Sequence, residues 1–239
     1  MKQILSVLFF FLPFFIFSQN WNQLGQDIDG EAAGDQSGYS VSLSNGGNIV
    51  AIGAPINNGN GTEAGHVRIY NWDGSSWTQV GNDIDGEAAN DMSGHSVSLS
   101  SDGGTVAIGA LNNNNGNGTE AGHVRIYNWD GSSWTQVGND IDGEAASDRS
   151  GHSVSLSSRL GERKVAIGAP FADDGNGIAG HVRIYHSPNA TTAINELNSL
   201  KRKLLEVVDI LGRNAKRTKN EPLFYIYDDG SVEKKIIIE

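Results

Sequence analysis

The chain has no cysteine, little proline and few basic residues for its acidic content. Its 239 residues include no Cys, five Pro, and 17 Lys and Arg against 28 Asp and Glu. Without cysteine the fold has no disulfides, so a hydrophobic core or a bound metal must supply its stability. The length allows one or two domains with a sizeable core.

The negative charge is concentrated in one part of the chain. Residues 19–187 carry seven Lys and Arg against twenty Asp and Glu, whereas residues 188–239 carry nine against eight. Such a surface repels nucleic acid and anionic lipid and attracts cations. We therefore exclude a nucleic-acid-binding function.

Long apolar runs are absent except at the N-terminus. The run from Ile4 to Phe17 follows Lys2, ends beside the small residue Ser18 and is fourteen residues long. A membrane-spanning helix needs roughly 20 residues. We therefore expect residues 1–18 to be a secretory signal peptide, with a membrane anchor as the alternative. The mature protein is expected to be secreted or held on the outer-membrane surface.

Familiar catalytic motifs are absent as well. The chain contains no Gly-x-Ser-x-Gly, no Gly-x-x-x-x-Gly-Lys and no His-Glu-x-x-His sequence. Paired carboxylates occur only in a loop that is repeated three times, and a residue that recurs in every copy is expected to be structural. The sequence therefore predicts that the protein is not an enzyme and has no organic cofactor. A hydrolase with a degenerate site is the alternative.

Three near-copies of one unit make up most of the chain. Trp21, Trp77 and Trp134 open the copies, 56 and 57 residues apart. The segments that begin at Trp77 and Trp134 differ at only two of their first 24 positions, which indicates duplication of one supersecondary unit. The expected organisation is a signal peptide at 1–18, repeats at about 21–76, 77–133 and 134–186 within 19–187, a linker at 188–202 and a tail at 203–239.

Each copy contains four strand-like segments, seen most clearly in the second. The segments His95–Ser100 and Gly122–Trp129 alternate polar and apolar residues, as half-buried strands do. Thr105–Gly109 is apolar on both faces, which indicates a central strand, and Trp134–Gly138 is the last. Turn sequences such as Asp130-Gly131 join them. A four-stranded antiparallel meander repeated about every 50 residues is typical of a β-propeller blade.

We therefore expect an all-β fold, a β-propeller-like array of three four-stranded antiparallel repeats. Closed propellers typically have 4–8 blades, so three are too few for one chain to close. A short open stack, a six-bladed ring made by two chains and a truncated product are the alternatives. The third copy lacks an outer strand and the N-terminus has a spare one, Trp21–Gly25, a pattern that suits ring closure and suggests a homodimer.

An acidic crossover loop in each copy is a candidate calcium site. Its carboxylates fall at positions 1, 3, 5 and 9 of the loop, and a hard cation needs several oxygen ligands from one compact turn. The EF-hand spacing is incomplete, so the alternative is a solvated loop whose Asp side chains bind their own backbone. The candidate ligands are Asp27, Asp29, Glu31, Asp35, Asp83, Asp85, Glu87, Asp91, Asp140, Asp142, Glu144 and Asp148.

Three further sets of residues have both a functional and a structural interpretation. The Asn/Gly loops could bind a ligand, or they could be simple turns. The histidines at equal repeat positions could bind metal ions in a ring, or they could have a structural role on one face of the repeats. The tryptophans could stack on sugars or fill the space between blades. These sets are residues 57–62, 112–119 and 173–177; His66, His123 and His181; and Trp21, Trp72, Trp77, Trp129 and Trp134.

Two recurring motifs resemble a known family. Ser-Gly-Tyr/His-Ser-Val-Ser-Leu-Ser stands in each copy, and Ala-Ile-Gly-Ala-Pro stands at 51–55 and 166–170, with Leu111 replacing Pro in the middle copy. They resemble the Phe-Gly and Gly-Ala-Pro motifs of FG-GAP repeats in integrin α-chain propellers and their bacterial relatives, over about residues 21–186. The resemblance implies a propeller fold and a function in adhesion or ligand binding, often with bound calcium. The family's Asp-rich hairpin is reduced here, for example to Asn45–Asn48, so its usual calcium site is expected to be missing.

The C-terminal tail carries a second resemblance. Val-Val-Asp-Ile-Leu-Gly-Arg (207–213) and Phe-Tyr-Ile-Tyr-Asp-Asp-Gly (224–230) resemble the sorting tail of type IX secretion substrates in Bacteroidetes. The resemblance implies passage across the outer membrane by the secretion machinery. The tail pattern also predicts three strands in a small C-terminal β sorting domain.

Together these features predict a non-enzymatic secreted or cell-surface repeat protein for adhesion or ligand binding, exported by the type IX route. The alternative is a carbohydrate-binding surface protein for polysaccharide capture. The expected partners are the secretion machinery, an unidentified protein or glycan, and a second copy of the chain.

Overall fold

The structure is a computed structural model, and the part of it that can be described contains strands and no helix. None of its segments is a helix long and apolar enough to cross a membrane. The expected signal peptide and the linker lie outside the described residues. The described residues are 20–159, 162–173, 175, 177–187, 204–209, 213, 215, 222–228 and 232–236.

The first two repeats fold into the same antiparallel sheet. In each, four strands follow one another across the sheet and a two-residue fifth strand pairs with the far end of the third. The predicted meander is therefore confirmed, with one short strand added. The first sheet contains β1 (Ser40–Leu43), β2 (Ile49–Ala54), β3 (His66–Trp72), β4 (Trp77–Gln79) and β5 (Ile84–Asp85), and the second contains β6 (Ser93–Leu99), β7 (Thr105–Ala110), β8 (His123–Trp129), β9 (Trp134–Gln136) and β10 (Ile141–Asp142).

The third repeat forms a smaller sheet, and the tail forms another. Among the described residues the third repeat has three strands, so its sheet lacks the outer strand that β4 and β9 supply in the other two. The predicted three strands of the tail are confirmed as an antiparallel sheet. The third sheet contains β11 (Ser153–Arg159), β12 (Glu162–Ala169) and β13 (His181–Ser187), and the tail contains β14 (Leu204–Val208), β15 (Pro222–Tyr227) and β16 (Val232–Ile236).

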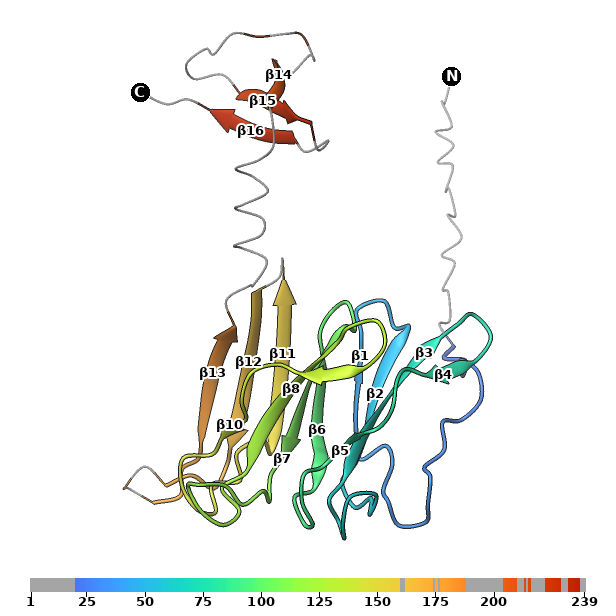
Figure 1. The fold of residues 1–239 in the computed structure, drawn as a ribbon, viewed down its shortest axis with the longest axis vertical. Helices are drawn as coiled ribbons and strands as arrows, with labels where there is room; N and C mark the ends of the chain where they lie inside the picture. Colours follow the sequence, from blue (N-terminus) through green and yellow to red (C-terminus); the bar gives the residue numbers. More distant parts are fainter. Residues whose placement is uncertain are drawn as a thin grey trace, which may run out of the picture.

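The three repeat sheets stand side by side, with the inner strands β1, β6 and β11 next to one another (Figure 1). The expected all-β, β-propeller-like array is therefore confirmed. The spare N-terminal segment lies at the end of the row opposite β13. Trp77 Nε1 donates a hydrogen bond to the carbonyl oxygen of Leu24 at 3.0 Å, which places that segment on the first sheet. Within the described residues, the three repeat sheets of one chain thus form an open row.

The hydrophobic core lies between neighbouring sheets. One buried cluster joins side chains of the first sheet, such as Ile69, to side chains of the second, such as Ile108. A second cluster joins Val124 of the second sheet to Leu156 and Ile167 of the third. Each sheet therefore buries one face against the next sheet, and the middle sheet buries both faces.

Candidate functional site

Each crossover loop meets the third strand of a sheet in a polar cluster that we call a junction. On β3, His66 and Arg68 are two residues apart, so their side chains lie on the same face of the strand. The preceding loop brings Glu31 to them, and the following loop brings Asp83. The first junction is Glu31, His66, Arg68 and Asp83; the second is Glu87, His123, Arg125 and Asp140.

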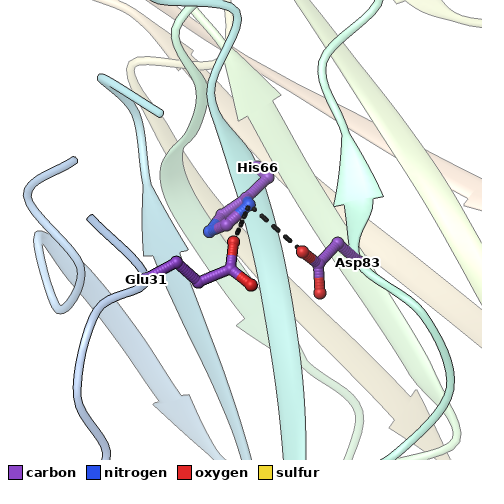
Figure 2. A group of neighbouring side chains, drawn as sticks. All are labelled: Glu31, His66 and Asp83. Atoms are coloured by element: carbon purple, nitrogen blue, oxygen red, sulfur yellow. Dashed lines mark ion pairs between the residues drawn. The ribbon is translucent and has the colours of Figure 1, made fainter. Parts of the chain in front are cut away.

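In the first junction two carboxylates flank one ring nitrogen of a buried histidine (Figure 2). His66 Nδ1 lies 3.8 Å from Glu31 Oε2 and 3.6 Å from Asp83 Oδ2. The other oxygen of Glu31 lies 3.8 Å from Arg68 Nη1. Arg68 also donates from Nη2 to the backbone carbonyl of Asp29 at 2.7 Å, and this bond holds the loop against β3.

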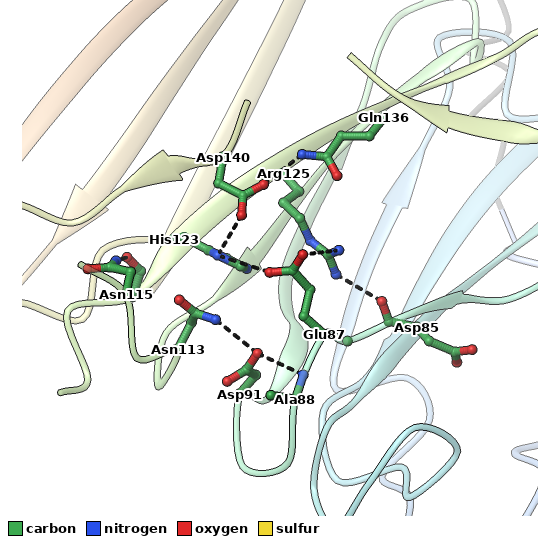
Figure 3. Close-up of polar contacts among 12 residues, drawn as sticks. Asp85, Glu87, Ala88, Asp91, Asn113, Asn115, His123, Arg125, Gln136 and Asp140 are labelled. Carbon is green, nitrogen blue, oxygen red and sulfur yellow. Dashed lines mark hydrogen bonds and ion pairs between the residues drawn. The ribbon is translucent and has the colours of Figure 1, made fainter. Parts of the chain in front are cut away.

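The second junction repeats this geometry (Figure 3). His123 Nδ1 lies 3.9 Å from Glu87 Oε2 and 3.6 Å from Asp140 Oδ2. Arg125 Nη1 lies 3.4 Å from Glu87 Oε1, and Arg125 Nη2 donates to the carbonyl of Asp85 at 2.8 Å. The arrangement is therefore built into the repeat.

A third junction is incomplete. Glu144 Oε2 lies 3.8 Å from His181 Nε2, and Glu144 Oε1 lies 3.3 Å from Arg183 Nη1. Arg183 donates to the carbonyl of Asp142 at 2.6 Å, as in the other two junctions. Within the described residues, however, no second carboxylate forms an ion pair with His181.

Burial sets the ionisation of the second junction. It lowers the pKa of His123 below its ordinary value, the charge of Arg125 lowers it further, and the Asp140 carboxylate opposes both. Burial also raises the pKa of Glu87, with Arg125 opposing and Asp140 adding to the rise. At neutral pH the imidazole of His123 is therefore neutral and faces two carboxylates. Imidazole and carboxylate are groups that can serve as ligands of divalent transition metals. In the described part of the chain, the histidine and the two carboxylates of each complete junction lie close enough together to hold a metal ion.

The carboxylates of one predicted calcium loop do not converge on one point. In the second loop, Asp83 at position 1 accepts a hydrogen bond from Gln79 at 2.6 Å and faces His66. Glu87 at position 5 faces the next histidine, one repeat later, and Asp85 at position 3 offers its backbone carbonyl to an arginine. The structure thus brings together position 5 of one loop and position 1 of the next.

The acid at position 9 has a local structural partner. The buried Asp91 carboxylate accepts from Ala88 N at 3.1 Å and from Asn113 Nδ2 at 2.9 Å. Asp35 makes the same pair of bonds with Ala32 and Asn57. Position 9 therefore closes the acidic loop onto the Asn/Gly loop.

The Asn/Gly loops fasten neighbouring segments in the same way. Asn60 Nδ2 donates to the carbonyl of Gly86 at 2.8 Å, and Asn117 Nδ2 donates to that of Gly143 at 2.7 Å. The side chains of these asparagines are used within the fold, which favours the structural interpretation of the loops.

The tryptophans pack between repeats. The ring centroids of Trp72 and Trp77 are 5.5 Å apart, and those of Trp129 and Trp134 are 5.4 Å apart. Trp134 Nε1 donates to the carbonyl of Val80 at 2.9 Å, and Trp77 Nε1 donates to that of Leu24 at 3.0 Å. Each pair therefore lies against a segment that precedes it by about one repeat length in the chain. These contacts favour the structural interpretation. Trp21 differs, because it is 99% exposed.

A row of rings crosses the three repeats, and we call Tyr39, His95, His152 and Phe171 the ring row. Neighbouring ring centroids are 4.9, 5.0 and 6.5 Å apart. Tyr39 Oη and His95 Nε2 share a hydrogen bond at 3.1 Å, and burial, helped by His152, lowers the pKa of His95. Tyr39, His152 and Phe171 are exposed.

The ring row was not predicted from the sequence, although the repeat positions of its residues indicate it. Tyr39, His95 and His152 occupy the same repeat position, 56 and 57 residues apart. Because the inner strands of successive sheets are neighbours, residues at this position meet in space.

No protein-family model and no curated protein matches the chain. Among solved structures the chain is similar to Kuenenia stuttgartiensis hydrazine synthase, with a TM-score of 0.36 and 12% identity over 90% of this chain and 53% of that one. It is also similar to a Bacteroides uniformis protein described as a 6-phosphogluconolactonase, with a TM-score of 0.33 and 15% identity over 84% and 55% of the two chains. For the periplasmic gluconolactonase of Pseudomonas aeruginosa the values are 0.34, 12%, 82% and 55%.

The chain spans about half the length of these structures, and TM-scores of 0.33 to 0.36 assign it neither a family nor an activity. The prediction that the chain is not an enzyme is nevertheless wrong as an exclusion, because two of the similar structures are named as lactonases. The physical reason is visible in the junctions. Side chains from different repeats meet there, so an assembled site needs no local sequence motif.

Proposed function

We propose that the chain is a secreted or cell-surface protein that binds an extended ligand along the ring row. The observation that supports this proposal is the regular succession of partly exposed rings across all three repeats. A ligand with repeating units can contact one ring in each repeat, so that weak contacts add up along its length.

A glycan is the ligand class that fits this row best. The faces of aromatic rings offer apolar area at low cost in conformational entropy, and their polar edges remain available for hydrogen bonds. Arg149 lies 5.1 Å from the ring centroid of Phe171 and pairs with Glu120 at 3.0 Å, which places charged hydrogen-bonding groups at one end of the row.

A length series of oligosaccharides tests this proposal. We expect calorimetric affinity for a bound glycan to rise as the chain grows from one sugar to several, because each added unit reaches another ring. Affinity that is independent of length, in a glycan that binds, would assign recognition to a single pocket elsewhere.

We also propose export by the type IX route, with the described tail sheet β14–β16 as part of the sorting signal. The support is the resemblance of the tail sequence, together with its folding as a separate three-stranded sheet. Deletion of residues 203–239 should leave the protein in the periplasm, whereas recovery of the truncated chain outside the cell would contradict this route.

A second proposed function is divalent-cation binding at the two complete junctions. Two carboxylates and an imidazole form a donor set that suits Zn²⁺ or Mn²⁺. Calcium takes 6–8 oxygen ligands, so it fits these clusters less well than the loop sequence suggested. A cation there would join the loops before and after each sheet and would offset their mutual repulsion.

Calorimetric titration with Zn²⁺, Mn²⁺ and Ca²⁺ tests the junctions. We expect at least two equivalents of a transition metal per chain, and one fewer in His123→Ala. His152→Ala is the matched control, because His152 lies in the ring row, and it should keep the full number. No heat with any of the three ions, or an unchanged number in His123→Ala, would contradict the proposal.

A further inference from the structure

The row of repeat sheets leaves one apolar face uncovered at each end. On β13, Val182 is 67% exposed and Ile184 is 73% exposed. At the opposite end, Val41 and Leu43 of β1 are 64% and 61% exposed. Apolar side chains grouped in this way on a strand face indicate an interaction surface.

The two faces are complementary because the repeats are near-copies. Val67 and Ile69 of β3 are the equivalents of Val182 and Ile184, and both are fully buried against the second sheet. Val97 and Leu99 of β6 are the equivalents of the two exposed residues of β1, and they are buried against the first sheet. The contact between the first two sheets therefore shows how the exposed face of β13 would fit the exposed face of β1.

The third sheet also has a pocket where the other sheets have a tryptophan. A cavity of about 280 Å³ lies between the second and third sheets, lined by Val137, Gly138, Leu156, Val165 and Tyr185 among others. In the preceding repeat, the equivalent Val80-Gly81 segment lies against Trp129 and Trp134. Ser187 takes the place of the first of these tryptophans, and no described atom fills the place of the second.

The exposed Trp21 is the residue that matches this pocket. It opens the same Trp-x-Gln sequence as β4 and β9, and the Leu24–Gly25 segment that follows it already lies on Trp72 and Trp77. Trp134 stands opposite Trp129 in the pairing of β9 with β8. The same register would place Trp21 of one chain opposite Ser187 of another, over its Val137–Gly138 segment.

The incomplete third junction supports the same contact. His181 Nε2 and Arg183 Nε are buried, and neither has a hydrogen-bond partner within the described residues. The missing carboxylate is the equivalent of Asp83 and Asp140, and Asp27 is the spare member of that series. Asp27 follows Trp21 at the same spacing as Asp83 follows Trp77, so a Trp21 side chain in the pocket would bring Asp27 to His181.

We propose that a second copy of the chain docks head to tail, its N-terminal segment completing the third sheet and its β1 face covering β13. A head-to-tail contact either closes into a ring or continues as a filament. Two copies place six sheets in the ring, within the range of 4–8 of closed propellers, so the assembly closes as a pair.

Sedimentation velocity of the purified chain over a range of concentrations tests the docking. We expect the mass of two copies. Trp21→Ala should raise the dissociation constant at least tenfold, because it removes the side chain that fills the pocket, and Ile184→Asp should give single copies, because it places a charge on the covered face.

Leu205→Asp is the matched control, since Leu205 is 61% exposed on β14 of the tail sheet and is not part of a repeat sheet. This variant should associate as the unaltered chain does. Far-ultraviolet circular dichroism of all three variants should be unchanged, because the altered side chains are exposed. A single-copy mass at every concentration, an assembly of three or more copies, or equal association of Ile184→Asp and the unaltered chain would overturn the proposal.

Discussion

Replacing Gly109 by alanine is expected to lower the free energy of unfolding by about 3 kcal/mol or more. A Cβ atom at Gly109 would overlap the carbonyl oxygen of Gly151 and the hydroxyl of Ser96. The Gly151 carbonyl is part of the backbone and accepts a hydrogen bond from Ser96 at 2.7 Å, so it cannot move aside cheaply. The second and third sheets approach each other at this point, and the added methyl group would separate them.

Chemical denaturation of Gly109→Ala beside Gly116→Ala measures this effect. A Cβ at Gly116 would have no atom within 4 Å, and the backbone there is outside the left-handed region. Alanine at Gly116 should therefore leave the stability unchanged or raise it slightly, because it restricts the unfolded chain. Equal stability of the two variants would show that the sheets do not meet as described.

Ile69→Ala and Ile184→Ala should differ by several kcal/mol although they make the same change at equivalent positions. Ile69 is 1% exposed between the first and second sheets, whereas Ile184 is 73% exposed. Truncating a buried isoleucine costs about 2–5 kcal/mol, and truncating an exposed one costs about 0.5 kcal/mol or less. Thermal or urea denaturation of dilute protein, with single copies of the chain, gives both values.

The comparison also separates folding from docking. At concentrations at which two copies associate, Ile184→Ala should weaken that association. In dilute protein, where the copies are single, it should leave the free energy of unfolding unchanged. If Ile184→Ala destabilised the single copy as much as Ile69→Ala does, β13 would be covered within one chain, and the open row would be wrong.

The strands of the repeats could be predicted from the sequence because their signals are local. Alternation from His95 to Ser100 and the apolar run from Thr105 to Gly109 correspond to β6 and β7, and the Asp130-Gly131 turn stands between β8 and β9. Each of these signals lies within a few residues, and three near-copies repeat it. The two-residue strands β5 and β10 were missed, since two residues are too few to show an alternation.

The candidate site was harder to predict because its residues are one repeat apart. The acidic loop was interpreted as a single chelating turn, whereas Glu87 and Asp140 come from successive loops and meet at His123. Their approach depends on how one sheet packs on the next, and no spacing within a loop encodes that packing. The ring row depends on the same packing.

Affinity electrophoresis in gels that contain soluble polysaccharides is the most direct test of ligand binding along the ring row. We expect at least one polysaccharide to retard the unaltered chain, and we expect the triple variant Tyr39→Ala, His95→Ala, His152→Ala to migrate freely in the same gel. Leu205→Ala, which removes an exposed apolar side chain of the tail sheet outside the row, should still be retarded. Equal retardation of the triple variant and the unaltered chain, or no retardation in any gel, would contradict glycan binding by the ring row.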